Sequence, residues 1–348
     1  MSPSRPRILV ARLDNAGDVL LTGPLVRAAA VTGRVVLLCS PTGEPAARLL
    51  PGVAEVVVAR AGWIEADGPP VTAASAGELV ERLAALELDE AVLPTSFHQS
   101  PLPLALLLRM AGVPRIGAIS VDFPGTLLDV RHLVPDDVHE VERSLSLGAA
   151  LGHHLPPGDD GRLAVRTTGP LPAEVAALDR PYVVVHPGAS VPARAWSEAS
   201  HARLVGELAA GGRSVVVTGS AGERALTRSV AGDTATDLGG RTDLAGLAAV
   251  LAGAAAVVVG NTGPAHLAAA VGTPVVSLYA PTVPAVRWRP WMVPHVLLGD
   301  QEIACAGCRA RRCPVPGHPC VEGIAVEDVV AAVEHLAAGR PVAGRIPS

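Results

Sequence analysis

The chain has 348 residues, of which 49% are hydrophobic and 18% are charged, and its formal net charge is −5. This length and composition exclude a disordered chain and indicate a globular protein with room for two domains. The negative charge argues against nucleic-acid binding through bulk electrostatics. The sequence has no run of about 18 apolar residues, which a membrane-spanning helix would need. The apolar run near the N-terminus is too short for a signal peptide, so we expect a cytoplasmic protein.

Two further features of the composition bear on the site chemistry. Aromatic residues make up only 2% of the chain, which disfavours an aromatic platform for stacking bases or sugars. The sequence contains no Lys, so every permanently positive side chain is an Arg.

The first half of the chain alternates short apolar runs with amphipathic segments. This alternation predicts a parallel sheet with helices on both faces. The expected strands are residues 7–12, 35–39, 55–59, 90–94 and 116–119. The expected helices are residues 19–30, 44–50, 76–85, 102–111 and 138–151, the first of them irregular near Gly23 and Pro24.

Residues 155–172 are rich in Pro and Gly and predict a linker, after which the alternation starts again. The expected strands are residues 182–185, 214–218, 256–259 and 275–279. The expected helices are residues 198–209, 222–231, 244–252, 265–271 and 325–336. We therefore predict an α/β protein with two doubly wound, Rossmann-like domains, residues 1–160 and 161–348, facing a central cleft. The prediction includes the option that the last helix, residues 325–336, packs back on the N-terminal domain.

Residues 257–267, VVVGNTGPAHL, have the pattern of a buried strand, a polar turn and a helix N-terminus. Pro264 fits the first helical position, where its missing N–H is not needed. Free backbone N–H groups and the positive end of the helix dipole make such a turn an anion site. We expect it to hold a nucleotide diphosphate, with Asn261, Thr262, Gly263 and His266 as the contributing residues.

Three other turns carry candidate groups. Asp18, with Asn15 and Gly17, follows the first strand and is either a first-turn helix acid or a general base. After strand 182–185, Gly188, Ser190 and Arg194 form either an ordinary turn with a surface Arg or a phosphate site. After strand 214–218, Glu223 is either an acid favoured by the helix dipole or a ligand for a ribose hydroxyl.

Together these motifs resemble glycosyltransferase family 9, the ADP-heptose:lipopolysaccharide heptosyltransferases. The resemblance rests on RILVARLDNAGDVLLTGPLVRA, VVVHPGASVPARAWSEASHARLVGEL, VVVTGSAGE and GNTGPAHLAAAVGTPVVSLYAPT, in that order along the chain. It implies a GT-B fold, with the acceptor bound by the N-terminal domain and the donor nucleotide by the C-terminal domain.

Matched position by position, the resemblance implies specific roles. Asp18 is the general base, with Asn15 and Gly17 on the acceptor side, and Glu223 holds the ribose. Arg194 stands where the family usually has Lys, two residues before the motif residue Trp196. The turn Thr262, Gly263 and His266 binds the diphosphate. The chain departs from the family pattern at Asn261, where Asp is common, and at Ala280, where Gly is common.

The resemblance implies an inverting, metal-independent transfer of a sugar, most simply heptose, from an ADP-sugar to an acceptor hydroxyl. The acceptor is either a glycolipid like the lipopolysaccharide core or a soluble natural product; peripheral membrane contact is compatible with the first. Two alternatives stay open, a nucleotide-sugar 2-epimerase of the same fold and a non-catalytic nucleotide-binding protein.

Four of the five cysteines lie close together in sequence, with three Arg and His318 among them. Clustered cysteines in a cytosolic chain are more often metal ligands than disulfides, which suggests a structural zinc. Free thiols that pack a loop, or one labile disulfide, are the alternatives. The candidate ligands are Cys305, Cys308, Cys313 and Cys320.

Overall fold

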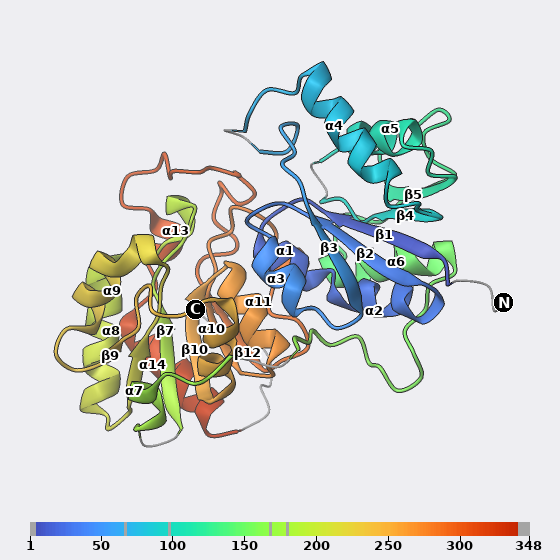
Figure 1. Ribbon diagram of the computed structural model, residues 1–348. Helices are drawn as coiled ribbons and strands as arrows, with labels where there is room; N and C mark the ends of the chain where they lie inside the picture. Colours follow the sequence, from blue (N-terminus) through green and yellow to red (C-terminus); the bar gives the residue numbers. More distant parts are fainter. Residues whose placement is uncertain (1–4, 66–67, 97–98, 167–168, 179–180, 340–348) are drawn as a thin grey trace. The chain divides into compact units, whose positions relative to one another are not determined.

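The computed structural model describes residues 5–65, 68–96, 99–166, 169–178 and 181–339. The chain forms two compact α/β units, residues 1–166 and 167–348 (Figure 1). The predicted boundary at residue 160 lies shortly before this one, because the start of the predicted linker is bound to the first unit. Arg27 Nε contacts Asp159 Oδ2 at 2.6 Å, and Arg27 Nη2 donates to the Arg162 carbonyl at 2.7 Å. Thr167 and Thr168 of the predicted linker lie outside the described residues.

Unit 1 is built on a six-stranded parallel sheet in the order β3-β2-β1-β4-β5-β6. Its strands are β1 (Arg7–Arg12), β2 (Arg34–Cys39), β3 (Val53–Val58), β4 (Glu90–Leu93), β5 (Arg115–Ile119) and β6 (Val130–His132). Its helices are α1 (Ala16–Leu21), α2 (Gly23–Thr32), α3 (Glu44–Leu49), α4 (Ala73–Ala84), α5 (Leu102–Met110) and α6 (Glu140–Leu151). The strand order reverses between β1 and β4.

Alternation along the strands divides the core of unit 1 between the two faces of its sheet. Leu9 and Ala11 of β1 are buried in one cluster with Leu83 of α4 and Leu108 of α5. Helices α4 and α5 lie together on that face, whereas α2 and α6 pack against each other on the opposite face (Figure 1). Burial on both faces explains why these strands are continuous apolar runs.

Unit 2 contains a second six-stranded parallel sheet, in the order β12-β11-β10-β7-β8-β9. Its strands are β7 (Tyr182–His186), β8 (Val215–Val217), β9 (Thr236–Asp237), β10 (Ala254–Gly260), β11 (Val275–Leu278) and β12 (His295–Leu298). Its helices are α7 (Ala173–Ala176), η1 (Pro192–Arg194), α8 (Glu198–Ala210), η2 (Ala221–Glu223), α9 (Arg224–Ala231), α10 (Leu244–Ala252), α11 (Gly263–Ala270), α12 (Ala285–Trp288), α13 (Pro319–Glu322) and α14 (Val326–Ala337). The order reverses between β7 and β10.

The last helix belongs to unit 2. Val329, Val333 and Leu336 of α14 are buried in one cluster with Leu204 of α8 and strands of the second sheet. The apolar face of α14 is thus used within unit 2, and a contact of this helix with the N-terminal domain stays a prediction.

One predicted helix is two helices in the structure. Helix α1 ends and α2 begins around Thr22, which caps both. The Thr22 hydroxyl donates to the Asp18 carbonyl at 3.0 Å, and Pro24 cannot donate a backbone hydrogen bond to continue the helix. The predicted irregularity is thus a full break, and it confines Asp18 to a short helix of six residues.

Two buried histidines are expected to make unit 2 sensitive to acid. Burial lowers the pKa of His201 to about 4, and burial with the nearby Arg194 charge lowers that of His266 to about 4. These values lie below the ordinary 6.5, so the unfolded state binds more protons as the pH falls through 6.5. The unfolding free energy is level above that pH and falls by about 1 kcal/mol for each histidine by about pH 5.5.

Urea unfolding across this pH range measures the effect. His201→Gln is expected to flatten the pH dependence, whereas His154→Gln, at an exposed position in unit 1, leaves it unchanged. Equal slopes for the wild type and the His201 variant would contradict the burial argument.

Candidate active site

The predicted donor residues lie on loops that follow neighbouring strands of unit 2. The strand order of this sheet reverses between β7 and β10, and ligands of open α/β sheets bind at the carboxyl ends of strands beside such a reversal. The residues concerned are Ser190 and Arg194 after β7, Glu223 after β8, and Asn261, Thr262, Gly263 and His266 after β10. Ser190 is exposed, so its hydroxyl is open to solvent.

Arg194 joins the loop after β7 to the loops after β10 and β11. Its Nε donates to the hydroxyl of Thr282 at 3.3 Å. Its carbonyl lies over Gly260, where a Cβ would come within 3.1 Å of that oxygen. The guanidinium also lowers the pKa of His266, secondary to burial, so the two side chains are neighbours. A half-buried cation therefore stands at the reversal of the sheet.

Glu223 both caps a turn and faces the loop after β7. Its Oε2 accepts hydrogen bonds from the backbone N–H and the hydroxyl of Ser220, each at 2.7 Å. The carboxylate also lies against Gly188, where a Cβ would overlap it. The local helix-capping role and the ligand-binding role are thus compatible, because capping uses one oxygen.

Helix α11 supplies the N-terminus that the sequence predicts, with one change. It begins at Gly263 with Thr262 as N-cap, so Pro264 is the second helical residue. The Thr262 N–H donates to the Gly260 carbonyl at 2.8 Å, and a role of Thr262 in binding a diphosphate stays a prediction. His266 is buried with a pKa lowered to about 4, chiefly by burial, and is neutral near pH 7. Among the described residues no group bonds its Nδ1.

The two departures from the family pattern touch each other. Asn261 is buried at the end of β10, and its Nδ2 donates to the carbonyl of Ala280 at 3.4 Å. Ala280 follows β11 and is fully buried. An amide can make this bond to a carbonyl, whereas an ionised carboxylate at position 261 could not.

Asp18 lies in the first turn of α1, at the carboxyl end of β1 in unit 1. Asn15 is the N-cap of this helix and is exposed, whereas Gly17 is buried. The Asp18 side chain is 22% exposed, so part of it is in contact with solvent. Asp18 therefore fits both readings of the sequence. It is an acid in the first helical turn, where the helix dipole favours it, and it is open enough to solvent to act as a base.

Arg12 binds three carboxylates, one of which is that of Asp18. Its Nη2 lies 3.0 Å from Asp18 Oδ1, its Nε 2.6 Å from Asp14 Oδ2, and its Nη2 3.3 Å from Glu140 Oε2. Burial alone lowers the pKa of Arg12, but the three carboxylates outweigh this and raise it. Arg143 adds a second cation, with its Nε 3.1 Å from Glu140 Oε1. The result is a buried charge cluster that reaches the surface at Asp18.

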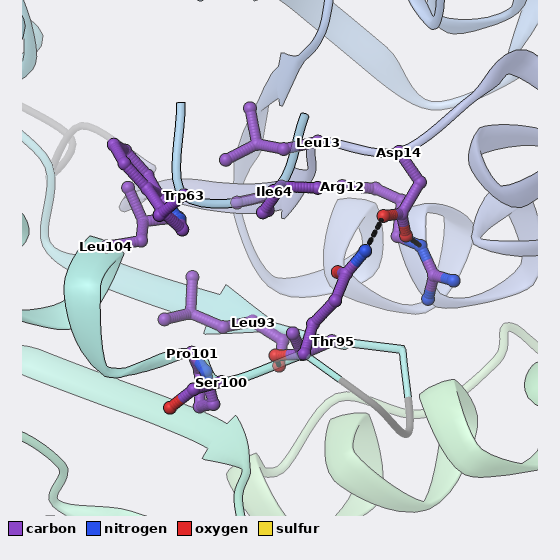
Figure 2. A pocket seen from close by; sticks show the side chains of 12 residues that line it. Arg12, Leu13, Asp14, Trp63, Ile64, Leu93, Thr95, Ser100, Pro101 and Leu104 are labelled. Atoms are coloured by element: carbon purple, nitrogen blue, oxygen red, sulfur yellow. Dashed lines mark hydrogen bonds and ion pairs between the residues drawn. The ribbon is translucent and has the colours of Figure 1, made fainter. Parts of the chain in front are cut away.

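A small pocket adjoins this cluster (Figure 2). Apolar side chains, among them Trp63, Leu93 and Leu104, line one part, and Arg12 and Asp14 line another. Its volume of about 20 Å³ holds no more than a water molecule or two, so a sugar ring does not fit inside it.

The cysteine cluster does not form the predicted zinc site. Within the described residues, no group of three or more His, Cys, Asp or Glu side chains is placed to hold a metal ion. Cys320 is buried in the apolar core of unit 2, whereas Cys308 is exposed. Burial raises the pKa of Cys320, and the neighbouring thiols raise it further. All four are free thiols, which fits the alternative of thiols packing a loop.

Sequence reasoning missed four polar residues at the two sites: Arg12, Asp14 and Glu140 in unit 1, and Thr282 in unit 2. Arg12 is a charged residue at the end of a buried strand, and this position was the one feature of the sequence that could have indicated its role. Asp14 and Asp18 lie close to Arg12 in sequence, but Glu140 is 128 residues away, and no local pattern links it to Arg12.

Among the described residues, no helix is long and apolar enough to cross a membrane.

The sequence model of glycosyltransferase family 9 (heptosyltransferase) matches residues 97–318. Lipopolysaccharide heptosyltransferase 1 of Pseudomonas aeruginosa is 36% identical over 180 residues, which cover 50% of this chain and 48% of that protein. Lipooligosaccharide heptosyltransferase 2 of Haemophilus influenzae is 32% identical over 114 residues, 30% of this chain and 33% of that protein. The chain thus matches about half or less of the length of these curated relatives.

Solved structures share the fold over nearly the whole chain. A family 9 glycosyl transferase from Veillonella parvula has a TM-score of 0.76 at 17% identity and covers 98% of this chain and 99% of its own. The E. coli heptosyltransferase WaaC with ADP-2-deoxy-2-fluoro heptose has a TM-score of 0.69 at 22% identity and covers 94% and 99%. The two Rossmann-like units therefore have the GT-B fold predicted from the sequence. The family model covers more than half of the chain, and the chain belongs to glycosyltransferase family 9.

Proposed function

We propose that this protein transfers heptose from ADP-heptose to a hydroxyl group of a saccharide acceptor, with inversion at the anomeric carbon. Family membership supports glycosyl transfer, and the curated relatives are named as heptosyltransferases. One solved neighbour is a heptosyltransferase with ADP-2-deoxy-2-fluoro heptose, which favours an ADP-heptose donor here.

The observation that carries the proposal is the convergence of donor-binding groups at the strand reversal of unit 2. Arg194 supplies a cation for the diphosphate, and the N-terminus of α11 at Gly263 supplies the positive end of a helix dipole. Neutral His266 contributes a polar ring edge, and Glu223 has a carboxylate oxygen for a ribose hydroxyl. These groups stabilise the negative charge that develops on the leaving ADP, so the proposal needs no metal ion.

Asp18 acts as the general base in this proposal. Its carboxylate takes the proton of the acceptor hydroxyl while that oxygen forms a bond to the anomeric carbon. The bond from the anomeric carbon to the diphosphate breaks, and ADP leaves with the electron pair. A single displacement of this kind inverts the configuration. Its support is the position of Asp18, accessible at the carboxyl end of β1 beside the strand reversal of unit 1.

The acceptor we propose first is a saccharide like the lipopolysaccharide core, because the names of the curated relatives specify such acceptors. A soluble natural-product acceptor is the competing outcome. A cytoplasmic location stays a prediction.

The test is to incubate the protein with ADP-heptose, and separately with other nucleotide sugars, in the presence of both acceptor types. Mass spectrometry then identifies the glycosylated product. We expect a heptosylated saccharide. Donor isomerised without acceptor would favour the 2-epimerase, and ADP binding without any conversion would favour a non-catalytic binding protein.

Gly188→Ala is expected to weaken ADP binding about tenfold. The added Cβ displaces the carboxylate of Glu223, which removes a charged hydrogen bond to ribose worth about 1.5 kcal/mol and also disturbs the bond from the Ser220 N–H. Isothermal titration calorimetry with ADP measures the loss, and thermal unfolding checks the fold. Gly206→Ala is the matched control, because a Cβ there meets no atom of the described residues within 4 Å. Unchanged ADP affinity in the Gly188 variant would contradict the role of Glu223.

A further inference from the structure

The segment that carries the four clustered cysteines is bound to the loop of Arg194. This cysteine segment, residues 301–320, contacts Ala193, the residue before Arg194 in η1. The Ala193 N–H donates to the carbonyl of Arg311 at 3.1 Å. His318 Nε2 lies 3.1 Å from the Ala193 carbonyl and donates to it, because a carbonyl only accepts. The cysteine segment thus binds both backbone polar groups of Ala193.

The same segment also binds the residue that accepts a hydrogen bond from the Arg194 side chain. The hydroxyl of Thr282 accepts from Arg194 Nε at 3.3 Å, and the Thr282 carbonyl accepts from the Arg309 N–H at 3.0 Å. The carbonyl of the preceding residue, Pro281, accepts from the Gly307 N–H at 2.7 Å. The cysteine segment is therefore bound to both loops that hold Arg194, the one after β7 and the one after β11.

Burial and backbone conformation both indicate that these contacts are built into the fold. Ala193 is 2% exposed and Thr282 is 4% exposed, and buried backbone groups are costly to leave without a partner. His318 has the left-handed backbone conformation, with φ 46° and ψ 54°, which residues other than Gly rarely adopt. Such a conformation persists where the surrounding structure holds it, and it is frequent at functional sites.

We propose that the cysteine segment positions Arg194 for the donor, with His318 as the positioning residue. This proposal rests on the proposed function of Arg194 in binding the diphosphate of ADP. The hydrogen bond from His318 to Ala193 fixes η1, and Arg194 is the last residue of η1. Binding costs less conformational entropy when the loop that carries the binding group is already fixed. His318 therefore acts on ADP through Arg194 and needs no contact with the nucleotide.

His318→Ala is expected to weaken ADP binding about five- to tenfold, because the Ala193 carbonyl loses this donor and η1 is held less firmly. His318→Gln keeps a side-chain N–H that can donate in place of Nε2, so it is expected to recover most of the affinity. Both variants place a residue other than Gly in the same left-handed conformation, so the comparison isolates the hydrogen bond. Titration calorimetry with ADP measures the affinities.

A double-mutant cycle with Arg194→Gln separates positioning from a merely structural role. If His318 acts through Arg194, His318→Ala weakens ADP binding no further in the Arg194→Gln protein, because the two changes remove one shared interaction. A general loosening of unit 2 would add the same loss in both backgrounds. Additive losses would overturn the proposal.

His335→Ala is the matched control. His335 is also a half-buried histidine of unit 2, but it lies on α14, which packs against α8, β10 and β11. Its replacement is expected to leave the affinity for ADP unchanged. Equal losses in the His335→Ala and His318→Ala proteins would overturn the proposal.

Hydrogen exchange of the wild-type protein provides a second measurement if His318→Ala does not fold. The N–H groups of Gly307 and Arg309 bind the loop after β11. ADP stabilises the positioned state of Arg194 and, through it, these two bonds, so saturating ADP is expected to slow their exchange about tenfold. Mass spectrometry of peptides that cover residues 305–311 measures the rates. Unchanged exchange with ADP bound would overturn the proposal.

Arg194→Gln alone distinguishes failure of this proposal from failure of the proposed function. If that variant binds ADP as tightly as the wild type, the proposed donor site is wrong and this proposal fails with it. Loss of affinity in Arg194→Gln, together with full affinity in His318→Ala, overturns this proposal alone.

Discussion

Replacing Asp18 with Asn is expected to lower kcat for heptose transfer by roughly 10²–10⁴-fold, the usual contribution of a positioned general base. The amide keeps the size of the side chain and can still accept a hydrogen bond from Arg12, but it cannot take a proton from the acceptor. In the proposed function the donor binds unit 2, so the affinity for ADP is expected to stay within about twofold. Steady-state transfer assays and titration with ADP measure the two effects separately.

Asp122→Asn serves as the control for that variant. Asp122 is exposed and also lies in unit 1, where it accepts a hydrogen bond from Ser100. Its replacement is expected to leave kcat unchanged. Near-normal turnover in Asp18→Asn would show that another group removes the proton, and the proposed mechanism would then be wrong.

Arg194→Gln is expected to weaken ADP binding by roughly 10- to 100-fold and to lower kcat as well. A charge-assisted hydrogen bond to a diphosphate contributes about 1.5–3 kcal/mol, and the charge on the leaving ADP grows in the transition state. Arg194→Lys keeps the charge, so it is expected to recover most of the affinity. Titration calorimetry with ADP and steady-state kinetics measure the two losses.

Arg228→Gln is the control for the donor site, since Arg228 is exposed on α9 of the same unit. It is expected to bind ADP as the wild type does. If the two Gln variants lose equal affinity, the effect comes from overall charge rather than from Arg194, and the donor site assigned here is wrong.

The sequence predicted those strands and helices that consist of continuous apolar runs. Strand β1 and helix α10 have the predicted bounds, because each is a continuous apolar run with clear ends: Arg7 and Arg12 bound β1, and Asp243 and Gly253 flank α10. The edge strands β6, β9 and β12 were missed. They are two to four residues long, and polar residues such as Asp237 interrupt them, so no alternation develops.

The same distinction between local and long-range patterns applies to the candidate site. Glycine turns at strand ends predicted the positions of Asn261 and His266 after β10, beside the strand reversal of unit 2, and of Glu223 after the next strand but one, β8. Their roles in binding a donor stay predictions. The cluster around Arg12 depends on Glu140, which is far away in sequence and meets Arg12 only in the folded unit. The zinc prediction was misled for a related reason: sequence spacing gives no sign that Cys320 lies in the apolar core.

The measurement that tests the central claim most directly follows ADP release and product formation together. The protein is incubated with ADP-heptose and the core saccharide acceptor, and chromatography with mass spectrometry quantifies ADP and the heptosylated product. The proposed transfer predicts equal molar amounts of the two, and neither without acceptor. ADP released without heptosylated product, or donor isomerised without ADP release, would contradict the assignment of this chain as a heptosyltransferase.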